Sequence, residues 1–473
     1  MNYQEALAYI YGFSDSERGD KYVRDRNENL PREARLLERL GNPQQQYSTT
    51  HVAGTKGKGS TSALIERVLR ESGLRVGLYT QPDLHTYRER MRVDGHLISE
   101  EEMAQLVPEV RAAVERIQES HEFGPFITYE VSTALAFLFF WRQQAQHAVI
   151  EVGIGGRLDA TNVITPLVSV IASISYDHMN ILGDTLAQIA TEKAGIIKPH
   201  GVVVTSAQDA EALLAIAAVA ERRQARMIRI GSADADTAQH EVGQGLLPPL
   251  QYRYQLEERK GELQHFTVWT PTQTYQHLEI PLAGTYQLEN ATLALAALEQ
   301  LRERGLAWDE TMLRAGFRKV RWPGRIDVVG EHPMLIADGA HNADSMQKLM
   351  QALRDSFAMH RLIVVLSVNR DKDIAGIARA LTPAYEVIVT RMYSTPRAAS
   401  IETLQEALAT HAPNVRVKTA SDTMTALAIA LSDASPDDLV CATGSIYFAA
   451  EALRWAAEHG SQRAAETIEG VDH

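Results

Sequence analysis

Cysteine is nearly absent from this chain of 473 residues. The single cysteine, Cys441, cannot form a disulfide within the chain, and such a composition is typical of a reducing compartment. Cys441 lies in an apolar run, and no Cys-His pairing is apparent in the sequence. We therefore interpret it as a packed core residue and not as a nucleophile.

Long apolar runs are absent too. The most apolar stretch, 134–141, is far too short to span a bilayer and predicts a buried helix. The N-terminal segment carries Glu5, Asp15, Glu17 and Asp20 and has no long apolar stretch, so we expect no secretory signal. These features predict a cytoplasmic protein that does not associate with membranes.

Positive charge is in deficit. The chain has 47 Lys and Arg residues against 60 Asp and Glu residues, which gives a net charge of -13. An acidic surface does not attract phosphate backbones, so nucleic acids and anionic membranes are poor candidates as partners. We expect small-molecule substrates, and any basic residues that serve an anionic ligand must be gathered locally.

The length is about three times that of a typical domain, so two domains are expected. From about residue 49, short β-branched runs alternate with helical stretches such as Ser60–Glu71. This alternation predicts an α/β fold with a mostly parallel sheet wrapped by helices. The expected strands are Thr49–Ala53, Val76–Thr80, Ala148–Val152, Val168–Ile174 and Val202–Thr205.

A second alternating series follows Trp322-Pro323-Gly324, a step that breaks regular structure. We therefore expect one domain over 1–321 and another over 325–473. Between about 228 and 280, Tyr/Gln/Thr-rich alternation predicts a small antiparallel side sheet of the first domain. The polar tail after about Glu458 is expected to be exposed. The strands of the second series are Met334–Ala337, Leu362–Leu366, Glu386–Thr390 and Leu439–Ala442.

The strongest local motif is the glycine-rich segment His51–Thr61, which follows a strand and opens an amphipathic helix. Glycines let backbone N–H groups approach phosphate oxygens, and Lys58 can reach the outer phosphates. The strict P-loop pattern is not met, because Val52 occupies its first glycine position and Gly59 separates Lys58 from Ser60. Three glycines and two lysines in this segment, with no acid, still favour phosphate binding over a plain turn.

An acidic residue, Glu151, ends the next apolar strand and precedes a second glycine-rich turn. Gly153 and Gly155 suggest a dinucleotide fold, but Leu158 stands where the third glycine should be, so that interpretation is weak. A carboxylate at a strand end beside a phosphate loop is suited to hold Mg²⁺ directly or through water.

Two further segments carry candidate chemistry in the first half of the chain. The pair Asp177-His178 follows the strand predicted at 168–174 and could supply another metal ligand. Lys193 lies in an apolar helix end, where a buried ammonium would be costly, so a paired or modified state is plausible.

In the second half, the loop that holds Asp338 and His341 lies at a strand end, where ligand-contacting loops of open α/β sheets are found. Arg325, just after the boundary, could stabilise developing phosphate charge. The stretch 369–373 only loosely resembles a guanine-reading motif, because Arg370 occupies its lysine position.

Together these motifs resemble the folylpolyglutamate synthase/dihydrofolate synthase family, a branch of the Mur ligase superfamily. The resemblance covers most of the chain, from about Arg39 to Ser445, and rests on separated blocks in the expected order. These blocks are His51–Ser60, Tyr87–Gly95, Thr128–Glu130, Glu151–Asn162, Asp177-His178, Glu192–Pro199, Leu288–Ala291, Pro323–Arg325 and Asp338–Asn342.

The resemblance implies an ATP-binding N-terminal domain of P-loop type and a smaller Rossmann-like C-terminal domain. It implies that Lys58 binds the ATP phosphates, that Glu151 and His178 hold Mg²⁺, with two ions expected, and that Lys193 is carbamylated. The expected nucleotide contacts are Gly54, Thr55, Lys56, Gly57, Lys58, Gly59, Ser60, Thr61, Asn290, Arg325, Asp338 and His341.

Two departures from the family pattern affect the site. Lys56 stands where the family usually has Asn, and Gln81-Pro82-Asp83-Leu84 stands where it usually has Ser-Pro-His-Leu. That serine belongs to a loop on the metal and substrate side. We hypothesise that Asp83 or Thr80 supplies the missing oxygen, with Ser60 as a further metal ligand.

The implied activity is transfer of the ATP γ-phosphate to a folate or pteroate carboxylate, followed by attack of L-glutamate on the acyl phosphate. Lys58, His178, Lys193 and Arg325 are the expected catalytic residues, and the family suggests a monomer. Three alternatives remain at this point: a related ligase with another acid acceptor, a P-loop switch or binding module, and a dinucleotide oxidoreductase.

Overall fold

The computed structural model describes residues 1–14, 26–234, 247–392 and 397–469. Asp15, Glu17 and Asp20 of the N-terminal segment therefore lie outside the described residues. No described helix is both long enough and apolar enough to cross a membrane.

The strands of the first 280 residues form one eleven-stranded sheet in the order β11-β10-β9-β8-β7-β6-β1-β5-β2-β3-β4. The central strands from β9 to β2 pair in parallel, whereas β3 and β4 add antiparallel at one edge. The mostly parallel sheet predicted from the sequence is confirmed. The strands are β1 Ser48–Ala53, β2 Val76–Tyr79, β3 Met91–Val93, β4 His96–Leu97, β5 His147–Glu151, β6 Val168–Ile171, β7 Val202–Thr205, β8 Arg226–Ser232, β9 Leu250–Lys260, β10 Leu263–Trp269 and β11 Thr274–Ile280.

The antiparallel strands expected between about 228 and 280 are present as β9, β10 and β11. They do not form a separate side sheet, because β8 pairs in parallel with β9 and so joins them to the main sheet. The aromatic side chains of Tyr252, Phe266 and Tyr275 are buried in the same core as the parallel strands. This shared core explains why the sheet continues without a break.

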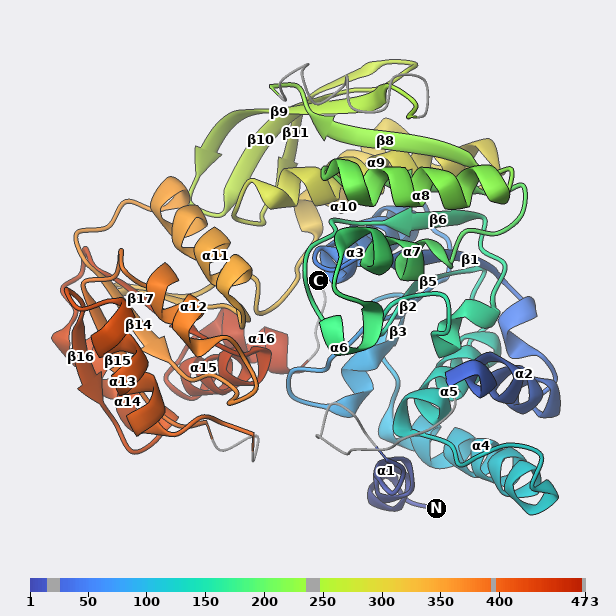
Figure 1. Cartoon of the computed structure of the whole chain (residues 1–473), viewed down its shortest axis with the longest axis horizontal. Coiled ribbons are helices and arrows are strands. Elements are labelled where there is room, and N and C mark those ends of the chain that lie inside the picture. The colour runs from blue at the N-terminus through green and yellow to red at the C-terminus, as the bar shows by residue number, and fades with distance from the viewer. Residues whose placement is uncertain (15–25, 235–246, 393–396, 470–473) are drawn as a thin grey trace.

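Helices cover both faces of this sheet (Figure 1). One core lies under α3, α9 and α10, and a second lies under α1, α4 and α5. The apolar stretch 134–141 belongs to α5, whose Ala134–Phe140 side chains are all buried, as predicted. The helices are α1 Tyr3–Tyr11, α2 Asn29–Arg39, α3 Lys58–Glu71, α4 Glu100–Ser120, α5 Thr128–Arg142, α6 Met179–Leu182, α7 Leu186–Ala194, α8 Ala210–Arg222, α9 Tyr286–Glu303 and α10 Glu310–Lys319, with 3₁₀ turns η1 Arg26–Glu28, η2 Pro43–Gln45, η3 Tyr87–Arg90 and η4 Ala160–Val163.

A smaller six-stranded sheet follows in the order β12-β13-β17-β14-β15-β16, parallel except for the β12–β13 pair. Cys441 lies in β17 and is fully buried, as expected of a core residue. We keep 1–321 and 325–473 as the proposed domain division. The elements are β12 Asp327–Glu331, β13 Met334–Ala337, β14 Leu362–Leu366, β15 Glu386–Val389, β16 Arg416–Thr419, β17 Leu439–Thr443, α11 Ala343–Ser356, α12 Ile374–Ala380, α13 Ile401–His411, α14 Thr423–Asp433, α15 Ile446–Glu458 and α16 Gln462–Glu469.

The polar tail does not extend into solvent as the sequence suggested. Residues 462–469 form α16, and Ala464 is fully buried against the second sheet. Arg463 pairs with Glu262 (2.6 Å) in the β9–β10 turn and with Asp327 (3.3 Å) in β12. These long-range ion pairs hold a polar helix that its own composition would leave exposed, and they join the two sheets.

The strand predicted at 168–174 ends earlier, at Ile171. The next residues turn toward the glycine-rich loop, where Thr55 donates its backbone N–H to the Ser173 carbonyl (2.8 Å). The Thr55 hydroxyl donates to the Ser175 carbonyl (3.1 Å). The apolar run predicts a strand through Ile174, but the residues after Ile171 support the glycine-rich loop instead.

Candidate active site

The glycine-rich loop connects the end of β1 to the first turn of α3, as the sequence predicted. Gly54 and Gly57 have φ values of 150° and 85°, which glycine adopts without strain. Gly57 caps α3, so the backbone N–H groups of the first helical turn, including that of Ser60, are directed out of the helix end, whereas the Thr61 N–H donates to the Gly57 carbonyl oxygen (2.9 Å). This is the backbone arrangement that binds a phosphate.

Asn290 and Trp322 border the loop on two sides. A Cβ at Gly57 would lie 2.2 Å from Asn290 Oδ1, and a Cβ at Gly59 would lie 2.7 Å from Trp322 Cζ2. Only glycine fits at these two positions. Helix α9 therefore brings Asn290, expected near the nucleotide, against the loop. The sequence predicts a domain boundary at Trp322 but not its contact with the loop.

Lys58 and Glu151 meet at the centre of the site. Lys58 Nζ lies 3.7 Å from Glu151 Oε1, and their side chains are 17% and 5% exposed. Burial raises the pKa of the Glu151 carboxyl, and the positive charge of Lys58 opposes that shift. The pairing joins the loop lysine to the acid at the end of the neighbouring strand β5, as the strand order requires.

Lys56 extends from the loop to the turn that holds Asp177 and His178. Its Nζ lies 3.1 Å from Asp177 Oδ2. Burial would raise the pKa of Asp177, but the charges of Lys56 and His178 outweigh burial and hold it well below its usual range. Burial lowers the pKa of Lys56. Lys56, which stands where the family usually has Asn, therefore adds an ion pair between two loops of the site.

His178 is the most open of the predicted metal ligands. Its side chain is 44% exposed, and its Nε2 lies 3.9 Å from Asp177 Oδ1. Partial burial of the ring lowers the pKa of His178 and outweighs the opposing charge of Asp177, so the neutral, metal-binding form is favoured. Among the described residues, no group of three or more His, Cys, Asp or Glu side chains forms a metal cage.

Lys193 is buried beside the phosphate loop. It is 4% exposed, and its Nζ donates a hydrogen bond to the Gly54 carbonyl oxygen at 2.9 Å. Burial, reinforced by the positive charge of Lys58, lowers the pKa of Lys193 to about 7. A large fraction of this amine is therefore neutral near pH 7.

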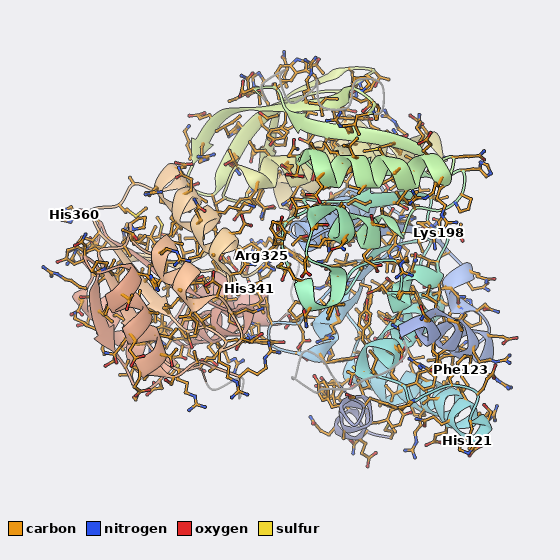
Figure 2. The ribbon with its side chains drawn as sticks, in the orientation of Figure 1. His121, Phe123, Lys198, Arg325, His341 and His360 are labelled. Carbon is orange, nitrogen blue, oxygen red and sulfur yellow. The ribbon has the colours of Figure 1, made fainter. Side chains whose placement is uncertain are left out.

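Arg325 and His341 of the C-terminal half lie on the side of that half that faces the first sheet (Figure 2). Burial raises the pKa of Asp338, and the Arg325 charge opposes it. Asp338 accepts backbone hydrogen bonds from Ile326 (2.9 Å) and Ala340 (2.7 Å), which fixes the linker beside Arg325.

His341 is held with Nδ1 2.9 Å from the Gly339 carbonyl oxygen. Burial, and next the charge of Lys56, lowers the pKa of His341 to about 3, so the ring is neutral near pH 7. The interaction with Lys56 places His341 opposite the phosphate loop. The structure therefore brings the C-terminal candidates and the loop to one site.

Thr80 and Asp83 lie on the loop after β2. Thr80 is buried, and Asp83 Oδ1 forms a 2.5 Å ion pair with Arg90 Nε. That ion pair competes with metal binding by Asp83. Metal binding by Thr80 and by Asp83 remains a prediction. Two other residues lie at the site: Gln81, which the sequence marked only as a departure from the family pattern, and Gln287, which it did not identify.

Gln287 accepts a hydrogen bond from Asn290 Nδ2 at 2.8 Å. Its own Nε2 is buried and finds no hydrogen-bond partner among the residues that the structure describes. A glutamine three residues before Asn290 on a helix faces the same side, so the helical spacing could have identified it.

Comparison with known proteins gives the same assignment. Residues 52–298 match the Mur ligase middle domain, and residues 324–446 match the Mur ligase glutamate ligase domain. The chain is 34% identical to the dihydrofolate synthase/folylpolyglutamate synthase of Bacillus subtilis, over 94% of this chain and 97% of that protein. It is 36% identical to the folylpolyglutamate synthase of Lacticaseibacillus casei, over 95% and 97%.

The structure is similar to that of Mycobacterium tuberculosis folylpolyglutamate synthase complexed with ADP. The TM-score is 0.82 at 32% identity, and the match covers 96% of this chain and 98% of the other. A dinucleotide oxidoreductase and a P-loop switch are thereby excluded as families. The chain belongs to the folylpolyglutamate synthase/dihydrofolate synthase family of Mur ligases.

Proposed function

We propose that this protein is an ATP-dependent ligase that adds L-glutamate to a folate or pteroate carboxylate and releases ADP and phosphate. The observation that carries this function is the site between the two sheets. There the glycine-rich loop with Lys56 and Lys58 lies near Arg325 of the C-terminal half, and Asp338 lies beside Arg325. Family membership supports ATP as the phosphate donor and glutamate as the amine.

The reaction needs an activated carboxylate. The acceptor carboxylate attacks the γ-phosphorus of ATP, which forms an acyl phosphate and releases ADP. The glutamate amine then attacks the acyl carbon, and the tetrahedral intermediate expels phosphate. Lys58 and Arg325 neutralise charge on the transferring phosphoryl group, and closure of the site excludes water that would hydrolyse the acyl phosphate.

The donor set at β5 and the loop fits Mg²⁺. Glu151 offers a buried carboxylate, Ser60 a hydroxyl, and Thr61 a buried Oγ1 that finds no hydrogen-bond partner among the described residues. Oxygen donors of this kind, completed by water and phosphate oxygens, are what Mg²⁺ prefers. We propose Glu151 and His178 as ligands, with two ions in the working site; bound Mg²⁺ would neutralise phosphate charge.

Lys193 is proposed to be carbamylated. Its lowered pKa supplies the neutral amine that reacts with CO₂, and the carbamate replaces a buried cation by an anion near Lys56 and Lys58. This exchange removes the electrostatic cost of burying another ammonium beside the loop. The carbamate keeps one N–H, which can still donate to the Gly54 carbonyl.

A related ligase with another acid acceptor is the second candidate. The observation that favours it is the loop after β2, where Gln81 and Asp83 replace the family's usual Ser and His, and where Asp83 is occupied by Arg90. We further propose that the protein works as a cytoplasmic monomer without nucleic-acid or membrane partners.

The test is phosphate release from ATP and Mg²⁺ with L-glutamate, adding dihydropteroate or a reduced folate in turn. Release that requires both glutamate and one pterin, with a product heavier by one glutamyl unit, would establish the activity and show which acceptor is used. If neither pterin stimulates phosphate release although ATP binds, folates and pteroates are rejected as acceptors and the second candidate is favoured.

A further inference from the structure

The loop after β2 holds an orphaned oxygen beside the proposed metal site. Gln81 Oε1 is buried and finds no hydrogen-bond partner among the residues that the structure describes. A buried polar atom without a partner is costly, typically by about 1–3 kcal/mol. Such an atom beside a buried carboxylate calls for an explanation, and a ligand that binds there is one.

The position of the Gln81 side chain is set by its neighbours. The Gln81 backbone N–H donates to Glu151 Oε2 at 3.3 Å, which fixes this residue at the acid. A Cβ at Gly153 would lie 2.6 Å from Gln81 Nε2 and 2.9 Å from the Tyr129 hydroxyl. The amide end of Gln81 therefore rests against Gly153, two residues after Glu151, in space that only glycine leaves open.

The carboxylate of Asp83 on the same loop is less available. Asp83 is engaged by Arg90 at 2.5 Å. Gln81, by contrast, bonds directly to Glu151 through its backbone and keeps its side-chain carbonyl free of protein partners in the described part of the chain. A neutral amide carbonyl is a hard oxygen donor of the kind that Mg²⁺ and Mn²⁺ accept.

We propose that the Gln81 side-chain carbonyl is a ligand of the divalent metal ion held by Glu151 when nucleotide is bound. This inference rests on the proposed function, because it requires a nucleotide-dependent metal at Glu151. It assigns to Gln81 the metal-ligand oxygen that the sequence suggested on Thr80 or Asp83. It also explains how a chain without the family's serine at this position can complete the metal site.

The experiment is a titration of Mn²⁺ into the full-length protein with a non-hydrolysable ATP analogue, with free Mn²⁺ followed by electron paramagnetic resonance and protein-bound Mn²⁺ taken as the excess over that held by the analogue alone. Gln81→Leu should weaken Mn²⁺ binding about tenfold or more, since loss of a supporting ligand commonly costs that much. Gln81→Glu, which keeps an oxygen at the same place, should bind Mn²⁺ at least as tightly as the native protein.

Gln44 provides a matched control, because its Oε1 is also buried without a partner among the described residues but lies in η2, away from the loop. Gln44→Leu should bind Mn²⁺ like the native protein. Native affinity in Gln81→Leu would overturn the proposal, as would an equal loss in Gln81→Glu, because the amide would then act only by filling space.

The titration does not depend on glutamate or on a pterin. If the native protein binds Mn²⁺ with the nucleotide but ligates no glutamate to folate or pteroate, the proposed function fails while the metal assignment stands. If the native protein binds no Mn²⁺ in the presence of nucleotide, Gln81 is not a metal ligand.

Discussion

Lys193 Nζ donates a 2.9 Å hydrogen bond to the carbonyl oxygen of Gly54 and so connects α7 to the first glycine of the phosphate loop. The donor is a lysine whose pKa burial lowers to about 7. An amine of this kind is poised between two chemical states near pH 7, and the site surrounds it with other cations.

We predict that Lys193 reacts with CO₂ in a pH-dependent manner. Only the neutral amine reacts, and with a pKa of about 7 the neutral fraction rises from about a tenth at pH 6 to about nine-tenths at pH 8. In protein stripped of CO₂, bicarbonate should therefore restore activity more completely at the higher pH. A carbamate signal in ¹³C NMR with labelled bicarbonate would check the modification.

Lys193→Met should lack both the carbamate signal and most of the activity, and a short carboxylate such as propionate should partly restore activity. A fully active Lys193→Met variant would show that the modification is not needed.

Removal of the loop lysine should affect phosphate chemistry. Lys58→Gln leaves the transferring phosphoryl group without one of its cations, so we expect kcat to fall by about 10²–10³-fold. Phosphate release measures this loss. Lys319→Gln, which removes an exposed ion pair with Glu71, is the control and should keep native kcat. Equal losses in the two variants would mean that Lys58 has no special role.

Space around the phosphate loop is limited by Trp322. Gly59→Ala would place a Cβ 2.7 Å from Trp322 Cζ2, and overpacking of this kind costs about 1–3 kcal/mol. We expect weaker binding of ADP, measured by calorimetry, and a lower melting temperature.

Trp322→Leu in the same chain should recover part of both quantities, because the smaller side chain makes room for the methyl group. If the double variant is as impaired as the sum of the two single variants, the contact with Trp322 is not the cause.

Asp338 positions the linker by accepting backbone hydrogen bonds from Ile326 and Ala340. Asp338→Asn keeps the shape but loses one acceptor, which leaves a buried N–H unpaired at a cost of about 1–3 kcal/mol. Chemical denaturation should show this loss of stability, together with weaker ADP binding. Asp344→Asn, at an exposed residue paired with Lys348, should change neither quantity.

Local patterns accounted for the β1–loop–α3 unit, because glycines and apolar spacing act over a few residues. They also placed Glu151, Asp338 and His341 at strand ends, where parallel sheets gather ligand-binding loops. Side-chain directions in loops depend on distant contacts and could not be predicted. Gln81 was recognised as a departure, but its direction depends on Glu151 and Gly153, some seventy residues away in the chain.

The sequence could not predict the docking of α16 for the same reason. Its helical pattern is polar, and only Arg463 with its distant partners shows why it packs. The continuity of the first sheet through β8 and β9 likewise depends on strand pairing that composition does not encode.

The attachment of α16 has a consequence for how the chain is made. Arg463 is synthesised 201 residues after its partner Glu262. Domains generally fold as they emerge, so the first sheet can form before this arginine exists. The two halves can therefore be joined through this ion pair only at a late stage, after the first sheet has formed, and until then Arg463 cannot hold them together.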